Sequence, residues 1–143
     1  NHELIKKNLA RFLEVWALDF DVSMTGVGSF TIVDADEETG LEPDECYFLG
    51  PAREGAPPDL AIEVVWSRPL LDKLESYRRL GVREVWVWEK GVVTPWVLAA
   101  SGYKRSRKSR LLPELDLSAL ARHAGQLDQH AALKAWRRAF KRH

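Results

Sequence analysis

The spacing of apolar residues at the start of the chain predicts a helix over residues 2–17. Apolar side chains recur there every three to four positions, as on the packed face of a helix; they are Ile5, Leu9, Phe12, Leu13 and Trp16. The next apolar segment, VSMTGVGSFTIV at 22–33, holds two short strand-like runs around Gly26 and Gly28. Glycine between two such runs is typical of a turn, so this segment predicts a β-hairpin.

The middle of the chain predicts an alternation of strands and helices. Strands are expected at 45–49 and 59–66, and a helix is expected to begin near Ser67 and Pro69, because proline is tolerated in a first helical turn, and to end at Gly81. The remaining expected elements are strands at 83–89 and 93–100, a loop and short helix within 111–124, and a last helix that carries Leu133, Trp136 and Phe140 on one face. This order predicts a single α/β domain over residues 1–143, with a mixed central sheet flanked by helices.

The composition is that of a globular protein, with 45% hydrophobic and 29% charged residues in a chain of 143. There is no apolar run long enough for a transmembrane helix and no sign of a secretion signal, so we expect a cytoplasmic protein without a membrane partner. The one cysteine, Cys46, excludes an internal disulfide and a cysteine-rich zinc site. The chain begins at Asn1 rather than methionine, which suggests that an N-terminal piece is missing.

The formal net charge is zero, which argues against a protein that coats nucleic acid non-specifically, but the charges are segregated. All the charged residues within 34–45 are acidic: Asp34, Asp36, Glu37, Glu38, Glu42, Asp44 and Glu45. Residues 103–110 carry only bases: Lys104, Arg105, Arg107, Lys108 and Arg110. Such runs are most often solvated surface; the alternative is a metal site with a basic surface that contacts a polyanion.

The strand at 59–66 carries two carboxylates that alternation places on one face, Asp59 and Glu63. A third acid, Asp44, opens the preceding strand, so Asp44 and Glu63 converge at one edge of the sheet if the two strands are neighbours. Converging carboxylates repel unless a proton or a cation lies between them. Oxygen ligands of this kind suit Mg²⁺ or Mn²⁺.

The helix after this strand carries a lysine inside its apolar stripe. At 100° per residue, Lys73 falls between Tyr77 and Leu80 on the face that packs against the sheet. A lysine in this position usually lays its stem on apolar surface and extends its ammonium group to solvent. The alternative is that Lys73 meets the carboxylates of the neighbouring strand.

Four segments together resemble the Uma-type family of bacterial proteins, which is assigned to the PD-(D/E)XK superfamily of restriction-endonuclease-like nucleases. They are EPDECYFLG at 42–50, PPDLAIEVVWS at 57–67, DKLESYRRLGVREVWVWE at 72–89 and SRLLPELDLSAL at 109–120. The resemblance covers about residues 2–140 and implies a restriction-endonuclease-like fold. The family's expected N-terminal segment is missing from this chain.

The resemblance also implies roles for individual residues around a Mg²⁺ or Mn²⁺ ion. Asp44 matches the first acid of the superfamily pattern and Glu63 the second, with the carbonyl of Val64 as a further metal ligand. The lysine expected two residues after Glu63 is Val65 here, and Lys73 matches the helical lysine that is thought to replace it in this family.

Two further positions remain open at this point. Asp59 matches the family's second Pro-Asp, and it is either part of the metal site or a turn residue at the start of the strand. On the first helix, where many superfamily members place an acid, Glu3 and Glu14 face away from the apolar stripe and His2 lies on it. His2 is therefore the candidate there, although a histidine at a chain start is more often incidental.

These observations predict a metal-dependent DNA endonuclease that acts as a homodimer, with the basic residues at 103–110 contacting the DNA backbone. One alternative is a catalytically inactive module of the same fold that binds nucleic acid or protein partners, since a shared fold does not establish activity. Another is a structural dimer with a tryptophan-rich surface. In that case each carboxylate should be paired with an arginine such as Arg53, Arg68 or Arg83, whereas a nuclease requires Lys73 near Asp44 and Glu63.

Overall fold

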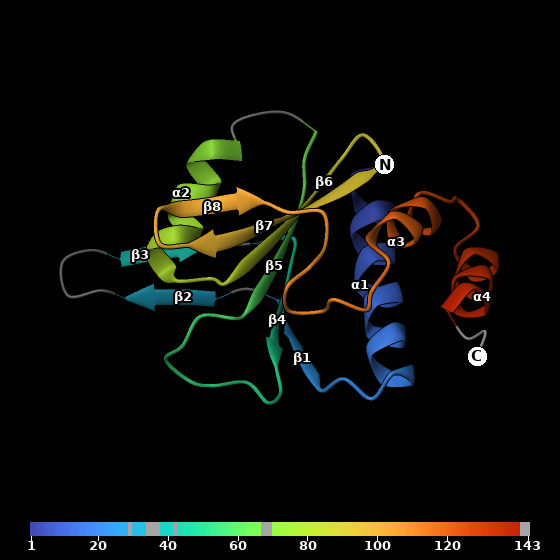
Figure 1. The fold of residues 1–143 in the computed structure, drawn as a ribbon, viewed down its shortest axis with the longest axis horizontal. Helices are drawn as coiled ribbons and strands as arrows, with labels where there is room; N and C mark the ends of the chain where they lie inside the picture. The colour runs from blue at the N-terminus through green and yellow to red at the C-terminus, as the bar shows by residue number, and fades with distance from the viewer. Residues whose placement is uncertain (29, 34–37, 42, 67–69, 141–143) are drawn as a thin grey trace.

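The computed structural model describes residues 1–28, 30–33, 38–41, 43–66 and 70–140. Figure 1 shows its helices, α1 (His2–Asp19), α2 (Leu70–Leu80), α3 (Leu117–Ala124) and α4 (Gln129–Phe140), and its strands, β1 (Met24–Val27), β2 (Phe30–Val33), β3 (Glu38–Leu41), β4 (Glu45–Leu49), β5 (Leu60–Val64), β6 (Glu84–Glu89), β7 (Val92–Ala99) and β8 (Gly102–Arg105). The helices and strands expected in the second half of the chain are confirmed. The expected helix start at Ser67 and Pro69 lies outside the described residues.

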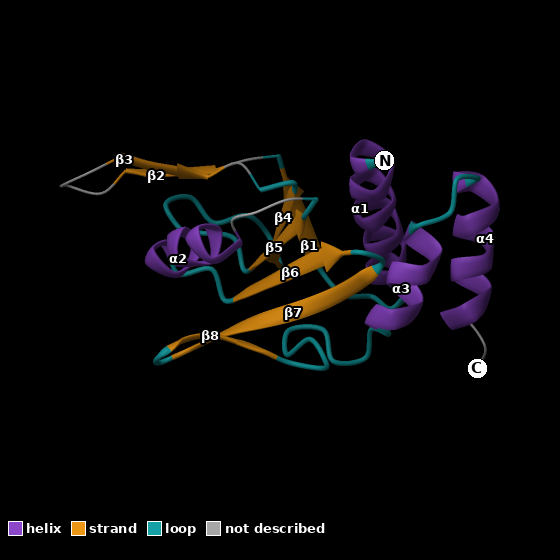
Figure 2. Ribbon diagram, turned by 90° about the horizontal axis from the view of Figure 1, so that it is seen from above, coloured by secondary structure: helices purple, strands orange, loops and turns teal. Residues whose placement is uncertain are grey.

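The main sheet has six strands in the order β1-β4-β5-β6-β7-β8. The pair β5–β6 is parallel and is connected through α2, whereas the other pairs are antiparallel. Helices α1, α3 and α4 lie on one side of this sheet and α2 lies on the other (Figure 2). The expected α/β class, with a mixed sheet flanked by helices, is therefore confirmed, and it agrees with a restriction-endonuclease-like fold.

Alternation along β6 shows how the sheet separates two packed layers. Trp86 and Trp88 belong to the core shared with α1, α3 and α4, whereas Val85 and Val87 belong to the smaller core beneath α2. Both layers exclude water from the central strands, and burial of this apolar area stabilises the fold. All five residues of β5 are buried, so any charged side chain on it must find a partner inside the protein.

The predicted hairpin at 22–33 is wrong. Strand β1 pairs with β4 in the main sheet, whereas β2 pairs with β3 in a separate two-stranded sheet. A local apolar pattern identifies strand residues but does not choose their partners, and β3 lies in the acidic segment, where no apolar alternation marks a strand. The acids Asp34, Asp36, Glu37 and Glu42 lie outside the described residues.

The sequence pattern also missed the short edge strand β8, because its four residues combine a glycine with two basic residues and show no apolar alternation. Among the described residues, no helix is long and apolar enough to cross a membrane.

Candidate active site

Glu63 lies on β5 beneath α2, and its side chain is 4% exposed. Lys73 Nζ lies 2.9 Å from Glu63 Oε1, and the hydroxyl of Tyr77 donates a hydrogen bond to Oε2. Burial raises the pKa of the Glu63 carboxyl, and the nearby charge of Asp44 raises it further, while the hydrogen bonds from Tyr77 and Lys73 act in the opposite direction. Burial is the largest of these influences, so the partners of this carboxylate only partly offset its loss of solvent.

The sequence of α2 explains how Lys73 and Tyr77 reach the same carboxylate. They are four residues apart and therefore lie on one face of the helix, one turn above the other. Leu74 and Tyr77 are buried against the sheet, which fixes the orientation of that face. The side chain of Lys73 is 47% exposed, so its ammonium group stands at the rim, with Glu63 below it. The geometry agrees with the helical-wheel position of Lys73.

Asp44 approaches the same edge of the sheet from the residue before β4. The antiparallel register pairs Glu45 with Ile62, so Asp44 lies beside the end of β5, where its Oδ2 accepts the backbone N–H of Val64 at 2.7 Å. His2 Nε2, at the start of α1, lies 3.6 Å from Asp44 Oδ1. The structure therefore brings His2, Asp44, Glu63 and Lys73 to one place from four separate segments.

The donor chemistry of this place fits a hard divalent cation. Asp44 and Glu63 are two acids close enough for the charge of one to raise the pKa of the other. Mg²⁺ typically uses one or two carboxylates and keeps several waters, so a complete protein cage is not required. Within the described ranges there is no group of three or more His, Cys, Asp or Glu side chains that could hold a metal. The two carboxylates are the residues that would bind the ion.

Asp59 is not brought to this site. It precedes β5 and lies at the opposite end of the strand, where its Oδ2 accepts the N–H of Leu49 at 2.7 Å. Arg53 Nη2 lies 3.0 and 3.1 Å from the two carboxylate oxygens, and Arg83 Nη1 lies 3.6 Å from Oδ1. Of the two interpretations of Asp59, this geometry favours a turn residue at the start of the strand.

Sequence reasoning missed Tyr77, which it treated only as part of the apolar stripe. The available signal was its position four residues after Lys73 on the same helix face, because a tyrosine there presents a hydroxyl to whatever the lysine meets. Cys46 is fully buried, and burial raises the pKa of its thiol to about 12. A thiol in that environment stays protonated and is inert as a nucleophile.

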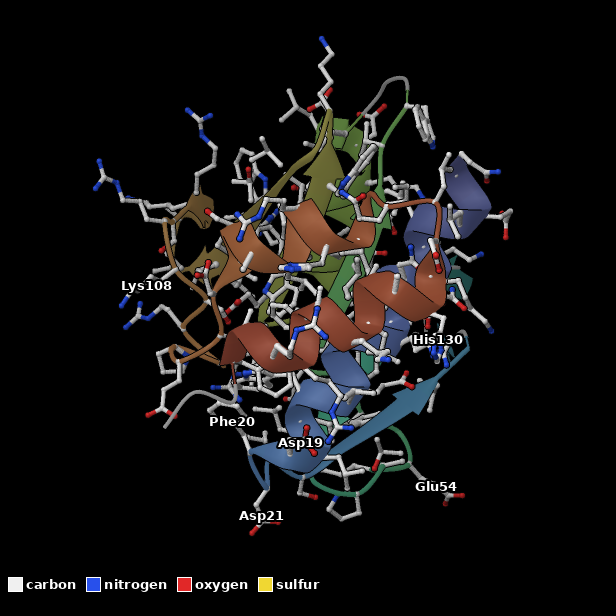
Figure 3. The ribbon with its side chains drawn as sticks, turned by 90° about the vertical axis from the view of Figure 1, so that its right-hand side faces the viewer. Asp19, Phe20, Asp21, Glu54, Lys108 and His130 are labelled. Carbon is white, nitrogen blue, oxygen red and sulfur yellow. The ribbon has the colours of Figure 1, made fainter. Side chains whose placement is uncertain are left out.

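The five basic residues of the segment 103–110 are exposed on β8 and the loop that follows it. This loop is tied to the sheet by Glu84, a buried carboxylate that accepts the backbone N–H groups of Arg110 and Leu111 and the indole N–H of Trp86. Figure 3 shows Lys108 at the outer side of the molecule. The basic segment is therefore held in place by its backbone while its side chains remain available to a ligand.

A cavity of about 790 Å³ lies elsewhere, between α1 and β1. It is lined partly by Glu14, Glu45 and Tyr47, and the Tyr47 hydroxyl donates a hydrogen bond of 2.9 Å to Glu14. Its lining contains none of Asp44, Glu63 and Lys73, so this cavity is separate from the carboxylate site.

Comparison with known proteins bears on the family of this chain. No curated protein matches the chain significantly. A protein-family model does match, over residues 1–128: it is the Uma2 family, with the description "putative restriction endonuclease". The match spans α1 to α3 and includes every residue that meets at the carboxylate site. The chain therefore belongs to the Uma2 family of restriction-endonuclease-like proteins.

Proposed function

We propose that this protein is a Mg²⁺- or Mn²⁺-dependent endonuclease that hydrolyses phosphodiester bonds in DNA. The observation that carries the proposal is the contact of Lys73 with Glu63 beside Asp44. Hydrolysis of a charged phosphodiester needs positive charge on both sides of the reacting phosphate. The two neighbouring acids would bind the metal cation, and the ammonium group of Lys73 would face the substrate.

Each residue of this site then has a defined task. When bound, the divalent ion supplies positive charge that polarises the phosphodiester and lowers the pKa of an attacking water. Asp44 and Glu63 would hold the ion, and the carbonyl of Val64 would be a third ligand. Lys73 orients the water or stabilises the negative charge that develops on the phosphate oxygens, a role that needs a preorganised cation at the rim.

Tyr77 would keep Glu63 correctly placed by donating to the oxygen that faces away from Lys73. His2 would help to orient Asp44 from the other side, at the contact of 3.6 Å. Neither residue needs to touch the substrate for this purpose, so both are positioning residues.

The exposed bases Lys104, Arg105, Arg107, Lys108 and Arg110 would contact the phosphate backbone and give salt-dependent binding without sequence readout. Cleavage of both strands of a duplex generally uses two sites, so a homodimer is part of the proposal.

An inactive module of the same fold is the competing interpretation. It is favoured by one observation, namely that both oxygens of Glu63 already have protein partners. A buried acid that is fully partnered can be structural, and in that case the protein would bind DNA or another protein without turnover.

The deciding experiment is a plasmid-nicking assay with added Mg²⁺ or Mn²⁺ and with EDTA, using the wild type, Glu63→Ala and Lys73→Ala. We expect nicking that requires the metal and is lost in both variants, while circular dichroism shows that each variant is folded. Arg78→Ala is the matched control and should retain activity, because Arg78 lies on the same helix and pairs with Glu75 rather than with the carboxylate site. Metal-dependent nicking that persists in Glu63→Ala would contradict the proposal.

A further inference from the structure

Trp66 differs from the other tryptophans of this chain in its exposure. Trp66 is 56% exposed, whereas Trp16, Trp86, Trp88 and Trp136 are each 6% exposed or less and Trp96 is of intermediate burial. Leaving an indole exposed to water loses the favourable free energy of burying it. A solvent-facing tryptophan beside a functional site is therefore a candidate for ligand binding.

Trp66 is held at the same end of the sheet as the carboxylate site. Val65 extends the parallel pairing by donating its N–H to the carbonyl of Trp88 at 2.8 Å, and the Trp66 and Trp88 rings lie 5.3 Å apart at an angle of 54°. The buried Trp88 thus supports the inner side of an indole whose outer side faces solvent. This support limits the motion of Trp66, so little entropy is lost when a planar ligand binds there.

Trp66 follows Glu63 by three residues at the end of β5, with its ring on the Trp88 face of the sheet and Glu63 on the α2 face, so a bound strand would pass around the end of the sheet to reach both. The Cα atoms of Glu63 and Trp66 are at most roughly 10 Å apart, because three residues of chain can span no more than this. Stacked nucleotides of one strand advance by about 3.4 Å each, so a nucleotide near Trp66 would lie about three positions from the phosphate at the site. Two exposed cations flank this end of the sheet: Lys73 on α2 and Lys90 in the turn between β6 and β7.

We propose that Trp66 forms a stacking subsite for an unpaired nucleobase, so that the preferred substrate is single-stranded, frayed or branched DNA rather than an intact duplex. The inference rests on the proposed function for the location of the scissile phosphate. Every base has a π-face, so stacking on an indole binds unpaired bases with little sequence preference. A base within a duplex is already stacked and would have to be unstacked first, which weakens its binding to the indole.

Binding in EDTA tests the subsite separately from cleavage. The probes are a fluorescently labelled single-stranded oligothymidylate and an abasic oligonucleotide of the same length and the same phosphate charge. The measured quantity is the ratio of the dissociation constant for the abasic strand to that for the thymidylate, in which the electrostatic contribution cancels. We expect the wild type to bind the thymidylate roughly 5- to 150-fold more tightly than the abasic strand, the range of stacking on one aromatic side chain. Trp66→Ala should reduce this ratio to about 1, and Trp66→Phe should give an intermediate value.

Leu71→Ala is the matched control, because Leu71 is an exposed apolar residue on the neighbouring first turn of α2 but cannot stack. Its ratio should equal that of the wild type. The stacking proposal is refuted if folded Trp66→Ala keeps the wild-type ratio. It is also refuted if the wild type itself binds the two probes equally, with a ratio of 1.

The two proposals fail in different ways. Metal-dependent nicking together with an unchanged ratio in Trp66→Ala would refute the stacking subsite and leave the nuclease. A ratio that depends on Trp66, without cleavage of any DNA in Mg²⁺ or Mn²⁺, would refute the nuclease and leave the subsite.

Discussion

Asp59 and Glu63 stand at opposite ends of β5, and both side chains are buried, yet their electrostatic surroundings differ. Asp59 meets a backbone N–H and two arginines, Arg53 and Arg83, which supply more positive charge than it carries. Glu63 meets one lysine and a neutral tyrosine, and it has another acid, Asp44, beside it. Burial without sufficient positive charge is unfavourable for a carboxylate, and a bound cation would correct it.

This contrast separates a structural acid from a functional one on the same strand. The charge of Asp59 is neutralised by protein groups alone. The cluster therefore attaches the loop before β5 to the sheet without a bound cation. In the Glu63 cluster one lysine lies beside two acids, and burial raises the pKa of Glu63. Perturbed carboxylates next to a partly exposed cation are typical of catalytic sites, whereas neutralised pairs are typical of structural ones. The four predictions below test this difference.

The largest expected effect is on catalysis by Glu63→Gln. The amide keeps the size of the side chain and can still accept from Tyr77, but it cannot hold a divalent ion, so metal-dependent nicking should fall by about 100-fold or more. Stability should not fall, because the substitution removes a buried charge that is only partly compensated. Nicking rates and urea midpoints measured on the same preparation check both parts. A variant that loses stability and keeps activity would reverse the roles assigned to the two acids.

Asp59→Asn should give the opposite result. The amide oxygen can still accept the N–H of Leu49, but the attraction of Arg53 and Arg83 is lost. Because both arginines are largely exposed, we expect a loss of about 1–2 kcal/mol in the free energy of unfolding. The nicking rate at a temperature where the variant is folded should remain close to that of the wild type. Urea denaturation gives the first quantity, and a large loss of activity in a folded variant would place Asp59 in the active site.

The stability of the metal-free protein should depend on pH through Glu63. Its pKa is raised above the ordinary 4.5, so the native state binds more protons than the unfolded state between 4.5 and the raised value. This contribution to stability is complete below 4.5 and is lost as the pH rises through the raised pKa. Urea midpoints of the wild type should therefore fall relative to those of Glu63→Gln as the pH rises from 4.5 toward neutrality. Parallel curves would show that the surroundings of Glu63 do not perturb it.

The smallest expected effect is that of Tyr77→Phe. The hydroxyl of Tyr77 donates to Glu63 and lowers its pKa, so its removal should raise that pKa further. The acid side of the pH profile for nicking should move to higher pH, with only a few-fold loss of rate at neutral pH, and the protein should lose about 1 kcal/mol of stability. An unchanged pH profile would indicate that Tyr77 does not influence the ionisation of Glu63.

The sequence predicts the elements around the site well because their patterns are local. The amphipathic period of α2 and the alternation of β5 placed Lys73 and Glu63 on facing surfaces, and the structure brings their side chains into contact. The position of Asp59 was harder to predict, since strand alternation assumes that the strand begins at that residue, whereas β5 begins at Leu60. Its arginine partners come from a loop and from the start of β6.

The rest of the fold depends on partners that are distant in the chain. The pairing of β1 with β4 rather than β2 is decided by the assembled sheet, and no local pattern of four residues encodes it. The contact of His2 with Asp44 likewise requires α1 to be docked, so its helix-wheel position was only a weak indication. The role of Tyr77 was not predicted, because a buried aromatic residue fits the apolar pattern whether or not its hydroxyl makes a hydrogen bond.

The short chain separation between Glu63 and its partners also bears on how the protein folds. Lys73 follows Glu63 by 10 residues, Tyr77 follows it by 14, and Asp44 and Val64 are 20 apart, whereas the contacts of Asn8 and Trp136 that join α1 to the C-terminal helices span 116 to 124 residues. Closing short loops costs less chain entropy, so contacts of low sequence separation form sooner. We therefore expect the amides of β5 and α2 to gain protection before those of α1 in pulse-labelled hydrogen exchange. The carboxylate site would then form early on the folding pathway, and the two ends of the chain would pack together late.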